Sequence, residues 1–197
     1  NLHLHADASV IVNATPVGMY PNTGISPIDL NRFSKLEGVL DVIYNPAKTK
    51  LLLDAEGLGI PHENGLWMLV AQAKEASEYF TGKKLSDSVI ERIHRVLSHQ
   101  MKNIVLIGMP GCGKTTVGSV VAARLKRSFY DIDTTVEMSR GESISEMMSH
   151  YGAEAFRDAE TDAVKSLSGL NGAVIACGGG TPIRRENMRL LRANGRV

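Results

Sequence analysis

The sequence of 197 residues contains few cysteines, few aromatic residues and no long apolar run. Its two cysteines, Cys112 and Cys177, stand in no CxxC or Cys/His pattern, which argues against a disulfide framework and against a zinc site. No apolar run approaches the roughly 20 residues that a membrane-spanning helix needs. Because a signal-peptide pattern is missing as well, we expect a protein of the reducing cytoplasm without a membrane partner.

An excess of charge of one sign is also missing. Lys and Arg total 22 against 21 Asp and Glu, so the formal net charge is +1. This balance gives no reason to expect nucleic acid or an anionic membrane as a partner. The length allows one large domain or two modest ones.

Neither end has the pattern of a natural terminus. The chain opens with Asn1 rather than Met, and it stops at Val197, where a helical pattern has ended and a strand pattern begins. We therefore expect an internal piece of a longer protein, with the remainder of the parent chain missing. His3 and His5 have no further ligand residue beside them, so we expect no metal site there.

The most informative motif lies in the second half. The apolar residues 104–107 predict a short buried strand. Residues 108–115 then fit the phosphate-binding pattern G-x-x-x-x-G-K-[ST], and residues 117–125 are apolar at helical spacing. The glycine loop thus has the strand and the helix that it requires. The residues expected to bind ATP are Gly111, Cys112, Gly113, Lys114, Thr115 and Thr116.

Each residue type in this loop has a chemical reason. Glycines allow a tight turn that brings backbone N–H groups close to phosphate oxygens, and the following helix adds the positive end of its dipole. Lys114 can reach the β- and γ-phosphates, and the Thr115 hydroxyl can ligate Mg²⁺. The motif predicts a nucleoside triphosphate site without identifying the acceptor.

Polar residues downstream are candidates for the acceptor site. Residues 127–133 predict a second strand that ends in the carboxylates of Asp131 and Asp133. A helical pattern covers residues 141–151, and another helix opens at residue 154. In that helix Arg157 and Glu160 are three residues apart and therefore neighbours on one face.

A third buried strand is predicted at residues 173–176, and a glycine run follows it. Three adjacent glycines at a strand end indicate close approach of the backbone to a ligand, with a plain flexible turn as the alternative. A basic helix is expected at residues 183–194, with Arg184 on the surface.

The blocks G-M-P-G-C-G-K-T-T, D-I-D, A-F-R-D-x-E and C-G-G-G, in this order, resemble shikimate kinase over residues 102–197. The resemblance implies transfer of the ATP γ-phosphate to the 3-hydroxyl of shikimate, with Lys114 and Asp133 as catalytic residues. It implies Thr115 and Asp131 as the Mg²⁺ site and Glu160 as the residue that holds Arg157. A carboxylate substrate needs a guanidinium, which Arg157 offers as a bidentate fork. The implied shikimate-binding residues are Asp133, Arg157, Gly178, Gly179 and Gly180.

The first half predicts strands at residues 9–13 and 38–44 and helices at 49–57, 66–80 and 88–100. Its blocks N-A-T-P-x-G-M, D-V-x-Y-N-P-x-x-T and N-G-L-x-M-L-V-x-Q-A resemble the C-terminal part of shikimate dehydrogenase. By position, the resemblance implies NADP contacts for Thr15, Val42, Gly65 and Met68, and shikimate contacts for Tyr44 and Gln72.

The dinucleotide fingerprint G-x-G-x-x-G is absent upstream of Gly108. The second resemblance therefore implies ancestry rather than NADP binding by this piece. In the piece alone, we expect Tyr44, Met68 and Gln72 to be packing or surface residues.

Together the two resemblances predict an α/β chain of two parts. Residues 1–100 would be an incomplete Rossmann-like remnant of an NADP domain. Residues 101–197 would be an incomplete P-loop kinase with a parallel sheet and helices on both faces. The parent would be a bifunctional enzyme of aromatic amino acid biosynthesis that uses ATP, Mg²⁺ and NADP.

We expect little or no turnover from the piece, because the family's lid and later arginines would follow Val197. Three alternatives stay open: a P-loop kinase for another hydroxylated acid such as a gluconate-like substrate, an NADP-dependent dehydrogenase with a passenger kinase half, and a non-catalytic nucleotide-binding fragment.

Overall fold

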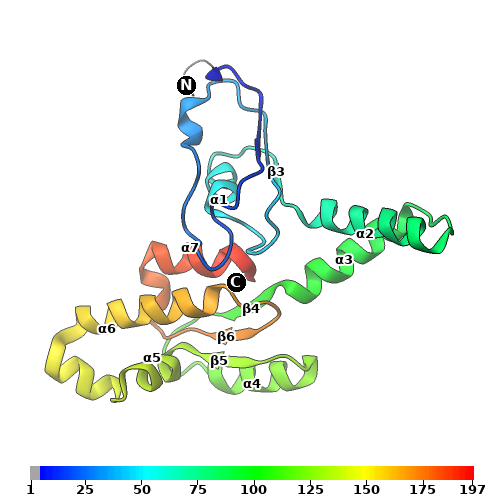
Figure 1. The fold of residues 1–197 in the computed structure, drawn as a ribbon. Helices are drawn as coiled ribbons and strands as arrows, with labels where there is room; N and C mark the ends of the chain where they lie inside the picture. Colours follow the sequence, from blue (N-terminus) through cyan, green and yellow to red (C-terminus); the bar gives the residue numbers. More distant parts are fainter. Residues whose placement is uncertain (1–4) are drawn as a thin grey trace. The chain divides into compact units, whose positions relative to one another are not determined.

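The structure is a computed structural model that describes residues 5–197, so His3 lies outside the described residues. The chain forms two compact units that divide between Gln100 and Met101 (Figure 1). In both units parallel strands are flanked by helices, which confirms the α/β prediction.

The first unit contains a three-stranded parallel sheet in the order β1-β2-β3. Asn13 pairs with Asp41 in the register, so β1 and β2 end side by side. The sequence predicts a strand to residue 44, but β2 ends at Asp41, because the Ile43 N–H bonds to Asp41 Oδ1 at 3.1 Å rather than to a neighbouring strand. The elements are β1 (Val10–Asn13), the 3₁₀ helix η2 (Leu30–Arg32), β2 (Gly38–Asp41) and β3 (His62–Glu63).

Helix α1 (Lys50–Gly57) covers this sheet. Thr49 caps its first turn, with the hydroxyl oxygen accepting from the Leu52 N–H at 3.4 Å. The apolar face of α1 is buried together with η2 and β2. The residues of this small core are Leu30, Val39, Leu51, Leu52 and Ala55.

Two further helices, α2 (Leu66–Thr81) and α3 (Ser88–Met101), form a helical hairpin around a polar turn. The nearly buried Glu78 accepts a hydrogen bond from the Leu85 N–H at 2.6 Å, and Lys74 lies 3.0 Å from Asp87. The sequence gives α3 an apolar stripe, yet none of its residues, all of them described, is buried.

The second unit is built on a four-stranded parallel sheet in the order β5-β6-β4-β7. Its sheet carries helices on both faces. Val105 and Ile175 point into the core that α6 and α7 cover. On the opposite face Gly118 of α4 packs on Phe129, where a Cβ atom would lie 2.5 Å from the ring. The strands are β4 (Asn103–Leu106), β5 (Phe129–Asp131), β6 (Val174–Ala176) and β7 (Gly195–Arg196).

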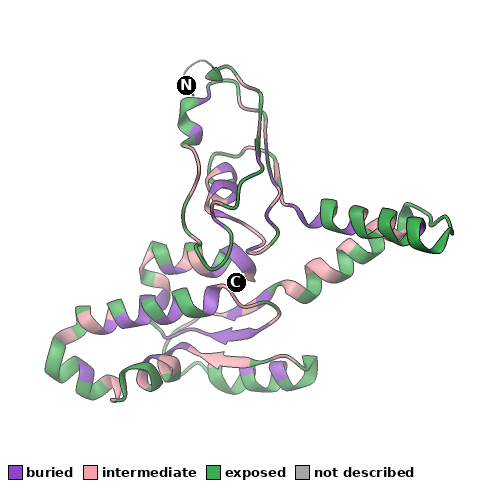
Figure 2. Cartoon of the chain, viewed as in Figure 1, coloured by how far each residue is buried: buried purple, intermediate pink, exposed green. Residues whose placement is uncertain are grey.

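The buried side of the second unit follows β6 and the inner face of α6 (Figure 2).

The sequence places Asp133 at the end of a strand, but β5 ends at Asp131 and Asp133 lies in the first turn of a helix that the sequence pattern did not reveal. The two helices predicted before and after residue 152 meet at Gly152, whose φ of 82° and ψ of 172° interrupt α6. The helices are α4 (Lys114–Leu125), α5 (Ile132–Arg140), α6 (Ile144–Ser168), the 3₁₀ helix η3 (Thr181–Ile183) and α7 (Arg185–Asn194).

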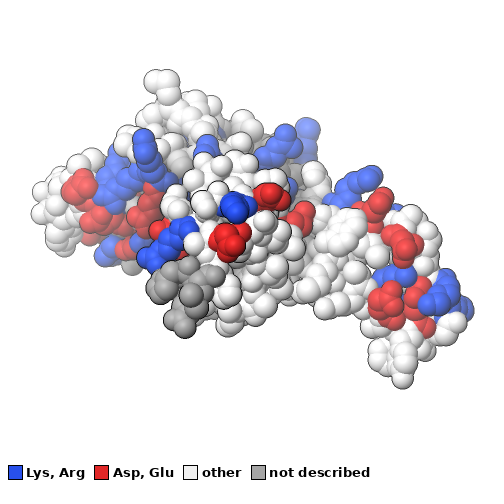
Figure 3. Space-filling view, turned by 90° about the horizontal axis from the view of Figure 1, so that it is seen from above, with Lys and Arg blue, Asp and Glu red and all other residues white. Residues whose placement is uncertain are grey.

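Positive and negative side chains are interspersed over the face drawn in Figure 3, in keeping with the balanced composition. Within the part of the chain that the structure describes, no helix has both the length and the apolar character needed to cross a membrane.

Candidate functional site

The glycine loop joins the end of β4 to the start of α4. Gly111 and Gly113 have φ angles of 75° and 85°, in the region that favours glycine. Lys114 begins α4 and folds back over the loop, where its Nζ donates to the carbonyl oxygens of Gly108 at 3.0 Å and Met109 at 2.8 Å. The amino group is thus held at the loop by weak neutral acceptors, which a phosphate can replace.

Two oxygen-bearing side chains meet beside this loop. Thr115 Oγ1 donates to Asp131 Oδ2 at 2.7 Å, while Asp131 Oδ1 caps α5 by accepting from the N–H groups of Asp133 and Thr134. The described residues contain no group of three or more His, Cys, Asp or Glu that could hold a metal ion. A pair of oxygens is nevertheless what Mg²⁺ takes from a protein when phosphates and water supply the rest of its shell. Thr115 and Asp131 therefore fit this ion.

Asp133 is the unusual carboxylate of the site. Its Oδ1 is buried and has no hydrogen-bond partner among the described residues. Burial raises the pKa of Asp133, and the negative charges of Asp131 and Glu160 raise it further. A carboxylate with an unused oxygen and a raised pKa can accept a hydrogen bond, and with it a proton, from a ligand hydroxyl.

Arg157 and Glu160 form a pair one helical turn apart on α6. Arg157 NH1 lies 3.0 Å from Glu160 Oε2, and Glu160 is completely buried. The guanidinium also lies over the ring of Phe156, with 5.1 Å between Cζ and the ring centroid. The Arg157 side chain is 28% exposed, so part of it is open to solvent.

The three glycines after β6 touch three different parts of this site. A Cβ atom on Gly178 would lie 2.5 Å from Asp133 Oδ1, and one on Gly179 would lie 2.5 Å from Pro110 Cγ in the phosphate loop. A Cβ atom on Gly180 would overlap the guanidinium of Arg157. The glycine run is therefore pressed against protein side chains, and it brings the phosphate loop, α5 and α6 together.

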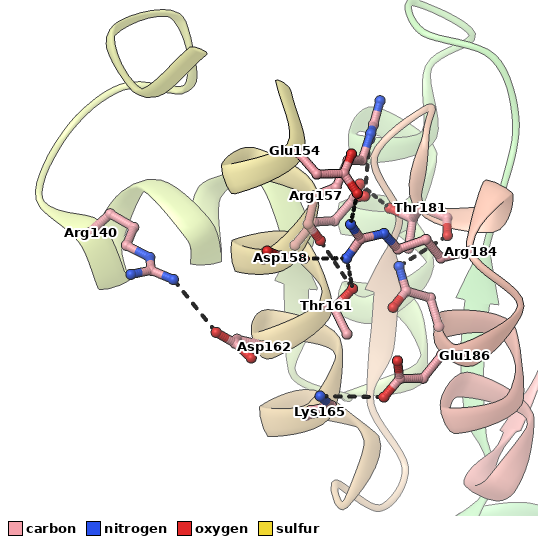
Figure 4. A network of polar contacts seen from close by, with 12 residues as sticks. Arg140, Glu154, Arg157, Asp158, Thr161, Asp162, Lys165, Thr181, Arg184 and Glu186 are labelled. Carbon is pink, nitrogen blue, oxygen red and sulfur yellow. Dashed lines mark hydrogen bonds and ion pairs between the residues drawn. The ribbon is translucent and has the colours of Figure 1, made fainter. Parts of the chain in front are cut away.

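Sequence reasoning missed three polar residues next to this run. Thr181, completely buried, donates to Glu160 Oε1 at 2.6 Å, and the buried Asn187 donates to the Thr181 carbonyl at 3.2 Å. Arg184, expected on the surface, keeps 26% of its side chain exposed and is anchored there to α6 (Figure 4). Its partners are Glu154 at 2.6 Å, Asp158 at 2.7 Å and the Thr161 hydroxyl at 3.2 Å.

In the first unit, the residues carried over from the dehydrogenase resemblance follow the strand ends. The structure brings Val42 and Gly65 together, because any Cβ on Gly65 would overlap the Val42 carbonyl. The Thr15 hydroxyl donates to Asn13 Oδ1 at 2.6 Å. Tyr44, Met68 and Gln72 are exposed.

A buried polar cluster that the sequence did not reveal lies at the same strand ends. Asp41 Oδ1 accepts from Asn13 Nδ2 at 3.1 Å, and Asp41 Oδ2 accepts from the Thr49 hydroxyl at 2.6 Å. These bonds join β1, β2 and the start of α1, so the cluster has a sufficient structural role.

A central parallel strand, a glycine loop and a helix that begins with Lys and Thr define the second unit as a P-loop nucleotide-binding fold. The family model described as shikimate kinase matches residues 110–197. The shikimate kinase of Thermodesulfovibrio yellowstonii is 46% identical over 95 residues, which are 48% of this chain and 55% of that protein. The chain thus spans about half the length of the curated relatives it matches.

Two solved structures each match about half of the chain. Shikimate kinase from Acinetobacter baumannii in complex with shikimate matches with 36% identity and a TM-score of 0.47, over 48% of this chain and 53% of that one. Shikimate dehydrogenase 1 from Peptoclostridium difficile also matches with 36% identity, with a TM-score of 0.44, over 48% of this chain and 36% of that one.

Proposed function

We propose that the second unit is the ATP-binding and shikimate-binding part of a shikimate kinase. The observation that carries this proposal is the convergence of a phosphate loop, an unpartnered carboxylate and the partly exposed Arg157 side chain on one glycine run. The match of residues 110–197 to the shikimate kinase family supports it.

The nucleotide is held by the loop and the start of α4. Backbone N–H groups of residues 111–116 bind the phosphate oxygens, and the dipole of α4 adds to the attraction. Lys114 exchanges its bonds to the Gly108 and Met109 carbonyls for bonds to the β- and γ-phosphates. Thr115 and Asp131 would hold Mg²⁺, which when bound neutralises negative charge that develops on the phosphates.

The acceptor is held on the other side of the glycine run. Arg157 binds the shikimate carboxylate through its planar fork, and Glu160 fixes the orientation of that fork. Asp133 accepts the hydrogen bond of the 3-hydroxyl and takes its proton as the oxygen bonds to the γ-phosphorus. The phosphoryl group passes to that oxygen as its bond to the β-phosphate oxygen breaks, and ADP leaves.

For the first unit we propose descent from the C-terminal part of a shikimate dehydrogenase. Exposed Tyr44, Met68 and Gln72 and the missing dinucleotide fingerprint favour ancestry over NADP binding by these residues alone. A titration with NADPH should therefore give no binding signal. Binding of NADPH to the chain would contradict this and favour the dehydrogenase alternative.

Calorimetric titration of the chain tests the kinase proposal. MgADP is titrated first, and shikimate is titrated second in its presence. We expect heat from both, with the shikimate signal lost in Arg157→Ala and the MgADP signal retained. Binding of MgADP without binding of shikimate would overturn the acceptor assignment, and stronger binding of gluconate than of shikimate would favour another small-molecule kinase.

A further inference from the structure

A chain of completely buried polar side chains lies behind Arg157. Glu160, Thr181 and Asn187 each have 0% of their surface exposed. Thr181 Oγ1 donates to Glu160 Oε1 at 2.6 Å, and Arg157 NH1 donates to Glu160 Oε2 at 3.0 Å. Asn187 Nδ2 donates to the Thr181 carbonyl at 3.2 Å. The fork of Arg157 is therefore connected to α7 through three successive hydrogen bonds.

The hydroxyl of Thr181 has a specific effect on Glu160. A buried carboxylate is stable only when its oxygens are bonded, and Thr181 and Arg157 take one oxygen each. Since the terminal torsion of a glutamate is broad, one bond leaves the carboxylate free to rotate, whereas two bonds on different oxygens fix its plane. The position of Glu160 Oε2 in turn fixes the position of the Arg157 NH1 that donates to it.

Thr181 also links this pair to the glycine run. Its N–H donates to the Gly178 carbonyl at 3.2 Å, and it directly follows Gly180, which lies against the guanidinium. The run therefore touches Arg157 directly through Gly180 and indirectly through Thr181 and Glu160. A change at Thr181 alters the second connection and leaves the first in place.

We propose that Thr181 is a positioning residue that orients Arg157 for a carboxylate ligand by holding Glu160, with Asn187 fixing the Thr181 backbone. The inference rests on the proposed role of Arg157 in shikimate binding. It assigns to Thr181 an effect on acceptor affinity and none on nucleotide affinity, because its hydrogen bonds go to Glu160 and Gly178 rather than to the phosphate loop.

The binding test uses the full chain with saturating MgADP. Thr181→Val keeps the shape of the side chain and removes its hydroxyl, and Thr181→Ser restores the hydroxyl. We expect the Kd of shikimate to rise about tenfold in Thr181→Val and to stay near the wild-type value in Thr181→Ser, with the Kd of MgADP unchanged in both. Thr181→Ala replaces the valine variant if that variant does not fold.

Thr49→Val is the matched control, because Thr49 is also buried and also donates to a carboxylate at 2.6 Å, but in the first unit. It should leave the Kd of shikimate unchanged. Equal loss of shikimate affinity in the control, or wild-type affinity in Thr181→Val, would overturn the inference.

NMR of the arginine side chains separates this inference from the proposed function. The guanidinium signal of Arg157, assigned by its loss in Arg157→Lys, should show slow rotation in the wild type and faster rotation in Thr181→Val. If shikimate does not bind but this change is seen, the proposed function fails and Thr181 still positions Arg157. If the Arg157 signal is the same in both proteins, the inference fails whatever shikimate does.

Discussion

Replacing Gly180 with alanine should reduce acceptor binding through displacement of the Arg157 guanidinium. The backbone angles of Gly180, φ −96° and ψ −11°, are accessible to alanine, so the substitution causes no backbone strain. The new Cβ, however, would lie far inside 3.0 Å of the Arg157 guanidinium, a separation that real Cβ atoms do not show. Restoring ordinary contact requires the guanidinium to withdraw by roughly 1 to 2 Å.

A displacement of about 1 Å in a positioning group can cost about a hundredfold in function. We therefore expect the Kd of shikimate, measured by calorimetry with MgADP present, to rise by between about ten and a hundredfold. The thermal midpoint should fall as well, because withdrawal of the guanidinium leaves Oε2 of the completely buried Glu160 without its partner. Gly57→Ala, where a new Cβ meets no atom within 4 Å, is the control. Unchanged shikimate affinity in Gly180→Ala would refute the placement of Arg157 at the acceptor site.

Three further predictions concern charged groups. Lys114→Ala should weaken MgADP binding at least tenfold without changing the thermal midpoint, and equal binding would contradict its role in the loop. The raised pKa of Asp133 means that, at pH values above the usual pKa of an aspartate, the native protein binds more protons than the unfolded chain. Stability should therefore fall as pH rises through that window, and Asp133→Asn should melt higher than the wild type at pH 7 but not at pH 3. The Leu85 N–H, with help from Lys74, holds the pKa of Glu78 at about 2. The ionised Glu78 therefore stabilises the fold at pH values above the usual pKa of a glutamate, and this stabilisation is lost as the pH falls toward 2. Glu78→Gln should lower the melting temperature of the first unit at pH 7, and a melting curve identical to the wild type's would contradict this.

The sequence predicted the fold and the candidate site best where the residues of a motif are consecutive. The strand, glycine loop and helix of the second unit are consecutive, so one stretch of sequence specifies all three. The secondary structure around Asp131 was harder to predict, because Ile132 between two aspartates fits a strand pattern as well as a helix start. The structure resolves the ambiguity through the Asp131 side chain, which caps α5 and so ends the strand.

Contacts between distant residues had no sequence signal at all. Thr181 and Glu160 are 21 residues apart, and Arg184 and Glu154 are 30 apart. Neither separation follows a helical or strand period, since each contact depends on how α6 packs beside η3 and α7. The surface position of Arg184 could therefore be predicted from its basic surroundings, but its partners on α6 could not.

Asp133 is where stability and the proposed function oppose each other. Burying a carboxylate oxygen without a partner destabilises the folded state, and the nearby charges of Asp131 and Glu160 add to the effect. An asparagine at this position would remove the charge repulsion, yet its amide could not take a proton from a hydroxyl. The neighbouring carboxylates are satisfied, Asp131 by Thr115 and the α5 backbone and Glu160 by Arg157 and Thr181. Asp133 Oδ1 is thus the one buried carboxylate oxygen without a partner among the described residues, and no contact there offsets its destabilising effect.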